Sequence, residues 1–589
     1  MSPRWRALLL AAPTAVSLLA SNRLAAQDTT AVGGAEPPTD SVVVPPPVIP
    51  VDEPSVPVGP LPPGTRYAFT HDSIMWVRGL TLSDLLAAIP GVYIARAGFL
   101  GQPEYIAYGG RGGASIEVYW DGMLVNPLGG DSLFIDPGQV QLTYLERVDV
   151  LVSPSRLTIY LVTAQHDRVE PRTELTVGTG DFNTGKFAGL FQKRWTSGLG
   201  VNLAADFVGT DGASGPGRGD QTFDVWARVD LHPSNKTQAS WQLRRQRQER
   251  DAVGTGPDVP RRFGTRTDIL VRLASGGEPH GMGLRAEALL ASSSWTSDSL
   301  VADQHVRQAR LTLRYRRPTS TLELTGLLGD ARITSGVQGS VGWVPFQGLV
   351  VSGSGRWQRH EGDRTSKGAM GSVGLYRGAF SLVGTVELRD AVQAPAILSD
   401  SAQRTLDRSI RAGLELGALR GHVGLVRRDR FLPLPYPDLR VIPGVDTSQA
   451  ATYVVANIRW ATSQALAFTA WYSTPASGGS ADLQPPKHGR AEITLRSKFW
   501  KTFRSGAFDL KAQVAMESWS TGRAGLDDSG QPITFVGATF YETFLQFQIA
   551  GFAGFWRFQN VYNSTLPFVP GLRFPRSVQT FGVKWRFSN

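Results

Sequence analysis

Cysteine is absent from the 589-residue chain. This absence excludes a disulfide framework and any cysteine-based metal site. Long hydrophobic runs are also scarce: beyond the N-terminal leader, no segment offers about 18 continuous apolar residues, so we expect no transmembrane helix. Dense blocks of one charge are missing too, because the formal charge of +10 is spread along the chain. The most basic stretch, RRQRQER at 244–250, interleaves arginine with polar residues. Dispersed surface or lumen charge is therefore favoured over a nucleic-acid partner.

Residue types that carry catalysis are present but do not converge. The stretch YGGRGG at 108–113 lacks both the Lys-Ser/Thr of a phosphate loop and the strand-to-helix setting of a dinucleotide fingerprint. The stretch ASGGS at 476–480 lacks the setting of a nucleophile elbow. We therefore expect no enzyme, no metal and no cofactor. The histidines show no pair at metal-ligand spacing; they are His71, His166, His232, His280, His305, His360, His422 and His488.

The N-terminus has the pattern of a secretory signal peptide, predicted here over residues 1–26. Arg4 and Arg6 precede an apolar stretch at 7–20, and small residues end at Ala26. A proline-rich linker at 27–64 follows and favours extended polyproline II structure. Inside it lies the β-prone run DSVVV, which could add as a strand to a partner's sheet edge, although ordinary linker is an open alternative. The run comprises Asp40, Ser41, Val42, Val43 and Val44.

A small mixed α+β unit is predicted over residues 65–171. Thr81 and Asp84 have the spacing of a capping box before an apolar helix face, and Pro90-Gly91 ends that helix. Strands are expected at 92–95 and 145–152. Between them, IEVYWDGMLVNP at 116–127 predicts a hairpin. Its Asp121-Gly122 pair fits a type I′ turn, in which both central residues need φ > 0.

From residue 172 to residue 589 the pattern changes to alternation with period two. In TFDVWARVDL at 222–231 and TFGVKWRFSN at 580–589, apolar and polar residues take opposite faces. A soluble sandwich would show the same alternation. The length without helical interludes, the aromatic residues at segment ends and the export signal favour a membrane barrel, in which every backbone group must be paired. We therefore predict an all-β transmembrane barrel of about 22 antiparallel strands.

These segments together resemble the TonB-dependent outer-membrane receptors, a family with a 22-stranded barrel closed by an N-terminal plug. The likeness rests on LSDLLAAIPGVYI, GGRGG, VYWDGMLVNP and LERVDVLVSP in the plug and on PGLRFPRSVQTFGVKWRF at the C-terminus. It implies a plug in the barrel lumen, the outer membrane of a Gram-negative-type envelope, and a monomer. The implied partners are outer-membrane lipid, TonB with its inner-membrane complex, and a small nutrient such as an iron chelate, cobalamin, a sugar or a peptide.

The resemblance also implies roles for individual residues. Residues 40–44 would be the TonB box. Arg111 and Arg147 would be plug arginines that pair with glutamates of the barrel wall, since a buried arginine without a partner is costly. Strand parity offers three inward-facing candidates, Glu492, Glu517 and Glu542. Ordinary lumen lining is the alternative for Glu517 and Glu542.

One departure from the family pattern keeps a second function open. No glycine occurs between Arg156 and Pro171, where the family carries a glycine-rich end to its plug. A passive or vestigially plugged porin-like channel without TonB coupling is therefore the alternative to active transport. The sequence assigns no ligand-binding residue, and its short loops favour a small solute over a protein ligand.

Overall fold

The computed structural model describes most of the chain from residue 64 onward. The predicted signal peptide at 1–26, the linker to residue 63 and the candidate TonB box at 40–44 lie outside the described residues. Further gaps within the described part are short; they fall at 77–79, 130–132, 213–218, 235, 254–258, 278–281, 298–302, 464, 500–501, 504, 563–565 and 589.

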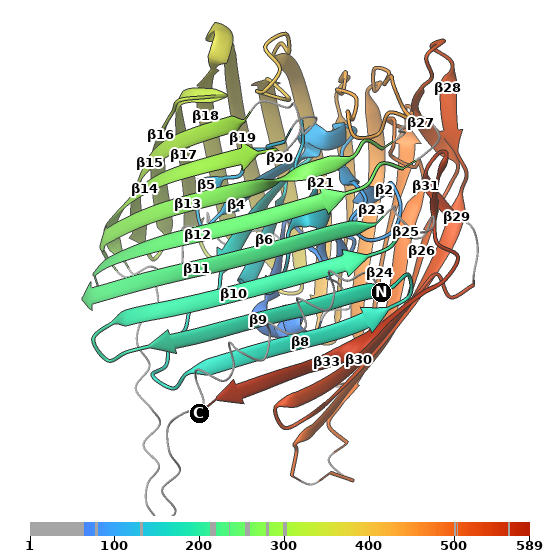
Figure 1. The fold of residues 1–589 in the computed structure, drawn as a ribbon. Helices are drawn as coiled ribbons and strands as arrows, with labels where there is room; N and C mark the ends of the chain where they lie inside the picture. The colour runs from blue at the N-terminus through green and yellow to red at the C-terminus, as the bar shows by residue number, and fades with distance from the viewer. Residues whose placement is uncertain are drawn as a thin grey trace, which may run out of the picture. The chain divides into compact units, whose positions relative to one another are not determined.

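A closed 22-strand antiparallel barrel forms the larger part of the molecule (Figure 1). Closure comes from β33, which pairs with β8 from Thr580↔Gly180 to Ser588↔Arg172. The barrel prediction is confirmed. The first strands are β8 (Arg172–Gly180), β9 (Thr184–Arg194), β10 (Leu199–Thr210), β11 (Asp220–Ser234), β12 (Thr237–Arg250), β13 (Arg262–Gly276), β14 (Gly283–Thr296), β15 (Gln304–Arg317), β16 (Ser320–Gly329), β17 (Ile333–Phe346) and β18 (Leu349–His360). The others are β19 (Thr365–Arg377), β20 (Phe380–Ala391), β21 (Gln403–Leu416), β22 (Leu419–Arg428), β23 (Ala451–Ala461), β24 (Leu466–Ser477), β25 (His488–Ser497), β26 (Phe508–Trp519), β29 (Ala538–Ile549), β30 (Phe552–Gln559) and β33 (Val578–Ser588).

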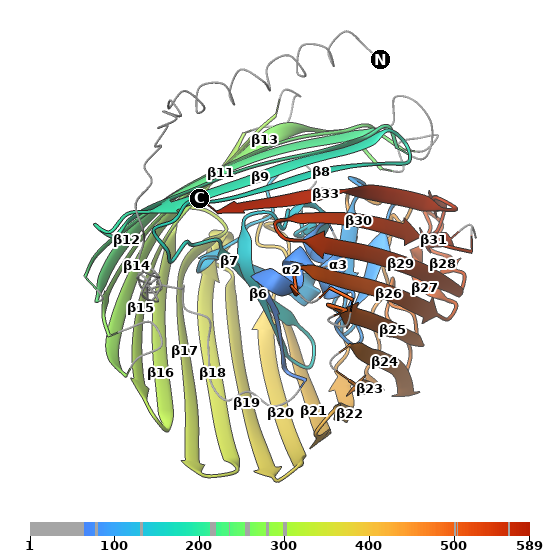
Figure 2. The ribbon, with the colours of Figure 1, turned by 90° about the horizontal axis from the view of Figure 1, so that it is seen from below.

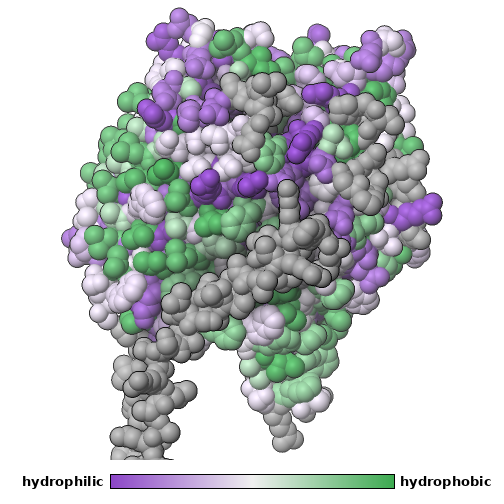
Figure 3. All heavy atoms as spheres, in the orientation of Figure 1, coloured by the Kyte–Doolittle hydropathy of each residue, from purple (hydrophilic) through white to green (hydrophobic). Residues whose placement is uncertain are grey.

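The alternation along each strand sorts apolar side chains outward and polar ones into the lumen. In β11, Phe223 and Val225 are exposed, whereas Asp224 and Arg228 are buried. An outward face of this kind is stable only against lipid, so the barrel is a transmembrane one. Figure 3 shows hydrophobic side chains over the barrel strands and a concentration of hydrophilic ones toward the top of the view. None of the described helices is long and apolar enough to cross a membrane.

The two ends of the barrel differ in the length of their connections. Arg172 and Ser588 lie at the end where hairpins are joined by short turns such as 318–319 and 378–379; we call this the turn end. The opposite loop end carries long connections, among them 429–450 and the loops that hold four short strands and a 3-10 helix. By the rule for bacterial barrels, the turn end faces the periplasm and the loop end faces outward. The short elements are η3 (Glu361–Asp363), β27 (Gly522–Leu526), β28 (Pro532–Phe535), β31 (Leu566–Val569) and β32 (Leu572–Phe574).

A small mixed sheet precedes the barrel strands and fills part of the lumen; we call this region the plug. Figure 2, a view from below, shows β6, β7 and α2 inside the ring of barrel strands. The sheet has the order β1-β6-β7-β4-β5, with β4 and β7 parallel. The plug elements are β1 (Arg66–Thr70), α2 (His71–Met75), α3 (Leu82–Leu86), β2 (Tyr93–Arg96), β3 (Glu104–Ala107), η1 (Gly112–Ser115), β4 (Ile116–Trp120), β5 (Met123–Leu124), η2 (Pro137–Gln139), β6 (Leu145–Val152) and β7 (Leu157–Thr163).

The plug has an apolar core that continues onto the barrel wall at Leu190 and Trp226. Leu85 of α3 packs with Val118, Val148 and Ile159 of the sheet, all at most 1% exposed. The predicted helix is present but shorter than its apolar pattern, and Thr81 makes no side-chain cap. Instead Asp84 Oδ2 accepts the backbone N–H of Leu80 at 2.9 Å. The predicted capping box is therefore not formed: Asp84 does accept a backbone N–H at the start of the helix, but that of Leu80 and not that of Thr81.

Candidate functional site

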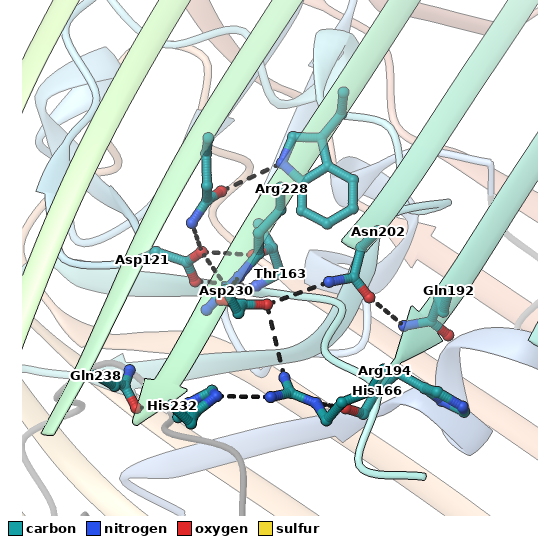
Figure 4. A network of polar contacts seen from close by, with 12 residues as sticks. Asp121, Thr163, His166, Gln192, Arg194, Asn202, Arg228, Asp230, His232 and Gln238 are labelled. Atoms are coloured by element: carbon teal, nitrogen blue, oxygen red, sulfur yellow. Dashed lines mark hydrogen bonds and ion pairs between the residues drawn. The ribbon is translucent and has the colours of Figure 1, made fainter. Parts of the chain in front are cut away.

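The Asp121-Gly122 turn joins β4 to β5 in the plug sheet, and the side chain of Asp121 anchors the turn to the barrel wall. Both residues have positive φ, 42° and 91°, as a type I′ turn requires. Asp121 Oδ2 accepts hydrogen bonds from Arg228 Nη1 of β11 at 3.0 Å and from Gln242 Nε2 of β12 at 2.6 Å (Figure 4). Thr163 of β7 donates to the same carboxylate through its backbone N–H at 3.0 Å. The turn thus holds the plug sheet against the wall.

This network continues from the wall to residues 164–171, which connect the plug to the barrel. Arg228 Nε also donates to Asp230 Oδ1 at 2.7 Å. Arg194 Nη2 of β9 lies 3.8 Å from Asp230 Oδ2, and Arg194 Nε donates to the carbonyl of His166 at 2.5 Å. Figure 4 shows these side chains in a row along the lumen face. The connector is therefore tied to the same wall strands as the hairpin turn.

Arg111 binds a wall carboxylate, but not one of the predicted glutamates. Its Nη2 donates to both oxygens of Asp407 on β21, and the pair is almost fully buried. The guanidinium also lies 4.6 Å from the ring centroid of Phe431, within cation–π range. The need of a buried arginine for a carboxylate was predicted correctly. The partner is corrected to Asp407, because inward parity does not say where around the barrel an inward-facing residue lies.

The ion pair observed for Arg147 lies within the plug, whereas a glutamate of the barrel wall was predicted as its partner. Its Nε donates to Asp149 Oδ2 at 2.6 Å. Arg66 of β1 binds the other oxygen of the same carboxylate at 2.7 Å. Arg147 and Asp149 lie two residues apart on β6, so they share one face of the strand.

The predicted glutamates belong to an ion-pair network within the wall. Arg490 of β25 binds Glu517 at 2.7 Å and Glu542 at 3.0 Å, and thereby joins three neighbouring strands. His488 Nε2 lies 2.9 Å from Glu517. Glu492 Oε1 accepts a long hydrogen bond from Thr494 at 3.4 Å. Arg490 therefore compensates Glu517 and Glu542, the wall glutamates that were predicted to pair with plug arginines.

The plug meets this wall network through an acid rather than an arginine. Arg557 of β30 binds Glu542 at 3.2 Å and reaches Asp84 of α3 at 3.1 Å. Arg96 of β2 binds Asp84 from the plug side at 3.3 Å. Burial alone would raise the pKa of Asp84, but Arg557 and Arg96 outweigh it, so the pKa of this carboxyl lies below its usual value. Asp84 was predicted only as a capping residue, and no pattern in the sequence pointed to Arg557.

Long loops cover the plug at the loop end with an aromatic cluster. Tyr93 of the plug stacks on Phe535 at 5.9 Å and donates its hydroxyl to the carbonyl of Phe568 at 3.0 Å. Tyr105 donates to Asp438 Oδ2 at 3.0 Å. Gly110 N–H donates to Gln484 Oε1 at 2.8 Å. The outer face of the plug is therefore closed by loop side chains on this side of the barrel.

Two cavities lie between the plug and the wall formed by strands β15 to β21. The larger, about 1690 Å³ including the solvent space at its mouth, lies toward the turn end, because Arg316 and Thr321 line it. The smaller, about 990 Å³ on the same measure, lies toward the loop end beside His360 and Phe431. We call the two together the seam. Four side chains line both cavities: Glu117, Arg156, Arg356 and Arg389.

Metal-ligating side chains do not gather in the part of the chain that the structure describes. No group of three or more His, Cys, Asp or Glu residues in that part has the arrangement of a metal site. The polar contacts of the lumen include arginine–carboxylate pairs, lysine and histidine contacts to carboxylates, and amide and hydroxyl hydrogen bonds. The arrangement holds a plug in place and leaves larger open spaces beside β15 to β21 than beside β8 and β30.

No protein-family model matches the chain. Solved structures do match its fold. The ferric enterobactin receptor PfeA from Pseudomonas aeruginosa aligns with TM-score 0.68 and 10% identity, over 89% of this chain and 99% of that one. The FrpB iron transporter from Neisseria meningitidis aligns with TM-score 0.67 and 10% identity, over 89% and 99%. The siderophore receptor PirA from Acinetobacter baumannii gives TM-score 0.67 and 10% identity, over 89% and 98%. The chain shares the plugged-barrel fold of these receptors and transporters.

Proposed function

We propose that this protein is an outer-membrane receptor that imports a small nutrient by TonB-coupled transport. One observation carries the proposal: the plug is fastened to opposite parts of the wall by buried ion pairs. Asp121 binds Arg228 on β11, Asp84 binds Arg557 on β30, and Arg111 binds Asp407 on β21. These pairs oppose displacement of the plug, because a charge that loses its partner while it stays buried costs about 3–5 kcal/mol. Passage of a nutrient-sized solute then needs work supplied from outside the barrel.

The substrate class to test first is an iron chelate. The fold neighbours include a ferric enterobactin receptor, an iron transporter and a siderophore receptor. Sequence identity near 10% supports the fold and leaves the ligand a matter for experiment. Cobalamin, sugars and peptides should be tested next, because the family resemblance of the sequence implies them as other small nutrients.

The test is uptake by cells that carry the intact protein or the variant Val43→Pro. Proline cannot donate to a strand ladder, so this change blocks pairing of residues 40–44 with TonB. Val56→Pro is the matched control, because it adds a proline elsewhere in the same proline-rich linker. We expect Val43→Pro to abolish accumulation of the labelled ferric chelate and Val56→Pro to leave it unchanged, at equal amounts of protein in the outer membrane.

Passive entry through a vestigially plugged barrel is the second candidate. The seam favours it, since open space extends toward both ends of the barrel and only a few side chains separate the two cavities. Uptake that is equal in Val43→Pro and in the intact protein would exclude TonB coupling and support this alternative.

A further inference from the structure

The wall of the seam is lined by unusually small side chains. On β17, β18 and β19 the lumen-facing positions include Ser340, Gly342, Ser352, Ser354 and Ser372. Their outward neighbours, such as Val341 and Val373, are exposed to the lipid side. The small residues leave the space between plug and wall unfilled. Figure 2 shows the plug strands β6 and β7 facing this part of the barrel.

Arginines outnumber carboxylates along the seam, although Arg147 and Arg111 are compensated by Asp149 and Asp407 just outside its lining. The larger cavity is lined by six arginines and three glutamates, with no lysine or aspartate. Arg314 is compensated by Glu323 at 2.9 Å within the wall. The loop-end cavity has four arginines and one glutamate. The arginines of the larger cavity are Arg147, Arg156, Arg314, Arg316, Arg356 and Arg389.

The carboxylate of Glu117 lies between the two cavities and separates them. Glu117 of β4 binds Arg356 Nη1 through Oε1 at 2.7 Å and Arg156 Nη1 through Oε2 at 2.5 Å. Burial would raise the pKa of Glu117, but Arg356, Arg156 and Arg389 outweigh it and lower the pKa to about 2. Glu117 therefore stays ionised and bridges plug and wall at any physiological pH.

The guanidinium groups around this bridge keep unused donors. Nε of Arg156 and Nε of Arg389 are buried and donate no hydrogen bond to any described residue. Glu387 lies beside them, and its Oε2 accepts from Ser153 Oγ at 2.7 Å. A buried guanidinium with an open donor is costly unless an anion compensates it. Carboxylate and phosphate oxygens match the planar fork of arginine, whereas a cation is repelled.

We infer that the seam is an anion route, with Glu117 as its gate and Arg156, Arg356 and Arg389 as the site that binds a small polycarboxylate or other oxyanion group of the solute. The anion takes the place of the Glu117 carboxylate on the arginines when the plug shifts. The inference rests on the proposed function in that the solute is an imported nutrient, but the ion selectivity of the seam is measured without TonB.

The test is the conductance of the purified full-length protein in planar lipid bilayers. We expect the intact protein to conduct little. Glu117→Gln removes the carboxylate that holds Arg156 and Arg356, so conductance should rise at least about tenfold, and a KCl gradient should give a reversal potential of the sign set by chloride. Citrate at millimolar concentration should block this current. Adding Arg389→Gln to Glu117→Gln should weaken the block.

Two further variants keep the test decisive. Glu323→Gln is the matched control, because Glu323 lines only the larger cavity and pairs within the wall; its conductance should remain at the level of the intact protein. Glu117→Ala removes the same carboxylate without leaving an amide among the arginines and serves if Glu117→Gln fails to fold, again with a chloride-selective current expected. A cation-selective or unselective current, or no current in either folded gate variant, would overturn the inference. If the gate variants show the expected anion-selective current but nutrient uptake does not need TonB, the proposed function is contradicted and the anion route is not.

Discussion

Asp121 of the plug hairpin and Arg228 of barrel strand β11 form a buried pair, with 3.0 Å between Oδ2 and Nη1. Both side chains are about 1% exposed. The hairpin that the sequence identifies as a tight turn is thus also a fastening point. Asp121 has two roles: its backbone adopts the positive φ that the turn requires, and its carboxylate compensates a buried arginine of the wall.

Asp121→Asn is expected to loosen the plug while it keeps the turn. Asparagine tolerates positive φ, so the type I′ geometry survives. The change leaves the Arg228 guanidinium without its carboxylate, at a cost of about 3–5 kcal/mol. Hydrogen exchange of the plug amides should speed up accordingly. Glu323→Gln, which changes a pair within the wall, should leave plug exchange as it is; equal effects of the two variants would contradict the anchor role.

Arg111 and Asp407 should couple in a double-mutant cycle. Arg111→Met and Asp407→Asn each leave one buried partner unsatisfied, so the double variant should cost less than the sum of the two. We expect a coupling free energy of about 1–3 kcal/mol in denaturation of the plug. Arg111→Met combined with Glu542→Gln should be additive within about 0.5 kcal/mol, because those residues share no partner. Coupling to Glu542 instead of Asp407 would restore the original sequence-based pairing.

The glycine at 109 should tolerate no side chain. Gly109 has φ of 58°, and a Cβ there would lie 2.7 Å from the backbone Cα of Ser155. Gly378 has the same φ of 58°, but nothing lies within 4 Å of its Cβ position. Gly378→Ala therefore measures the backbone strain alone, about 1 kcal/mol, and Gly109→Ala adds the clash. Protease cleavage of the plug should increase only in Gly109→Ala; equal sensitivity would exclude close packing at this position.

Asp136 makes plug stability depend on pH. Burial, and then the nearby Glu104, raise the pKa of Asp136 to about 7. The folded state therefore binds this proton more tightly than the unfolded state, so the contribution of Asp136 to stability is largest below about pH 4 and falls as the pH rises to about 7. Asp136→Asn keeps an oxygen for the N–H of Gly138 and removes the ionisable group. The variant should be about 1–3 kcal/mol more stable than the intact protein at pH 8 and nearly equal at pH 4; a flat difference across this range would refute the assignment.

The sequence was sufficient for those features that local patterns determine. Alternation in segments such as 222–231 predicted the barrel strands, and the pair Asp121-Gly122 predicted its turn, because both depend on neighbouring residues alone. The sequence did not predict which residues form ion pairs with each other. Arg111 and Asp407 are 296 residues apart, and parity only says that both point inward. The wall glutamates at 517 and 542 were predicted as partners of plug arginines, because the compensating Arg490 lies across a strand pairing that no local pattern reveals.

Tethering the plug to the wall is the most direct test of the central claim, that transport requires the plug to move. The chain has no cysteine of its own, so Gly91→Cys with Ser473→Cys introduces one defined pair; a Cβ on Gly91 would lie 3.9 Å from Ser473 Oγ, near disulfide range. We predict that oxidised cells lose uptake of the ferric chelate and that reduction restores it, while each single-cysteine variant transports under both conditions. Full uptake through the oxidised, cross-linked protein would contradict the account.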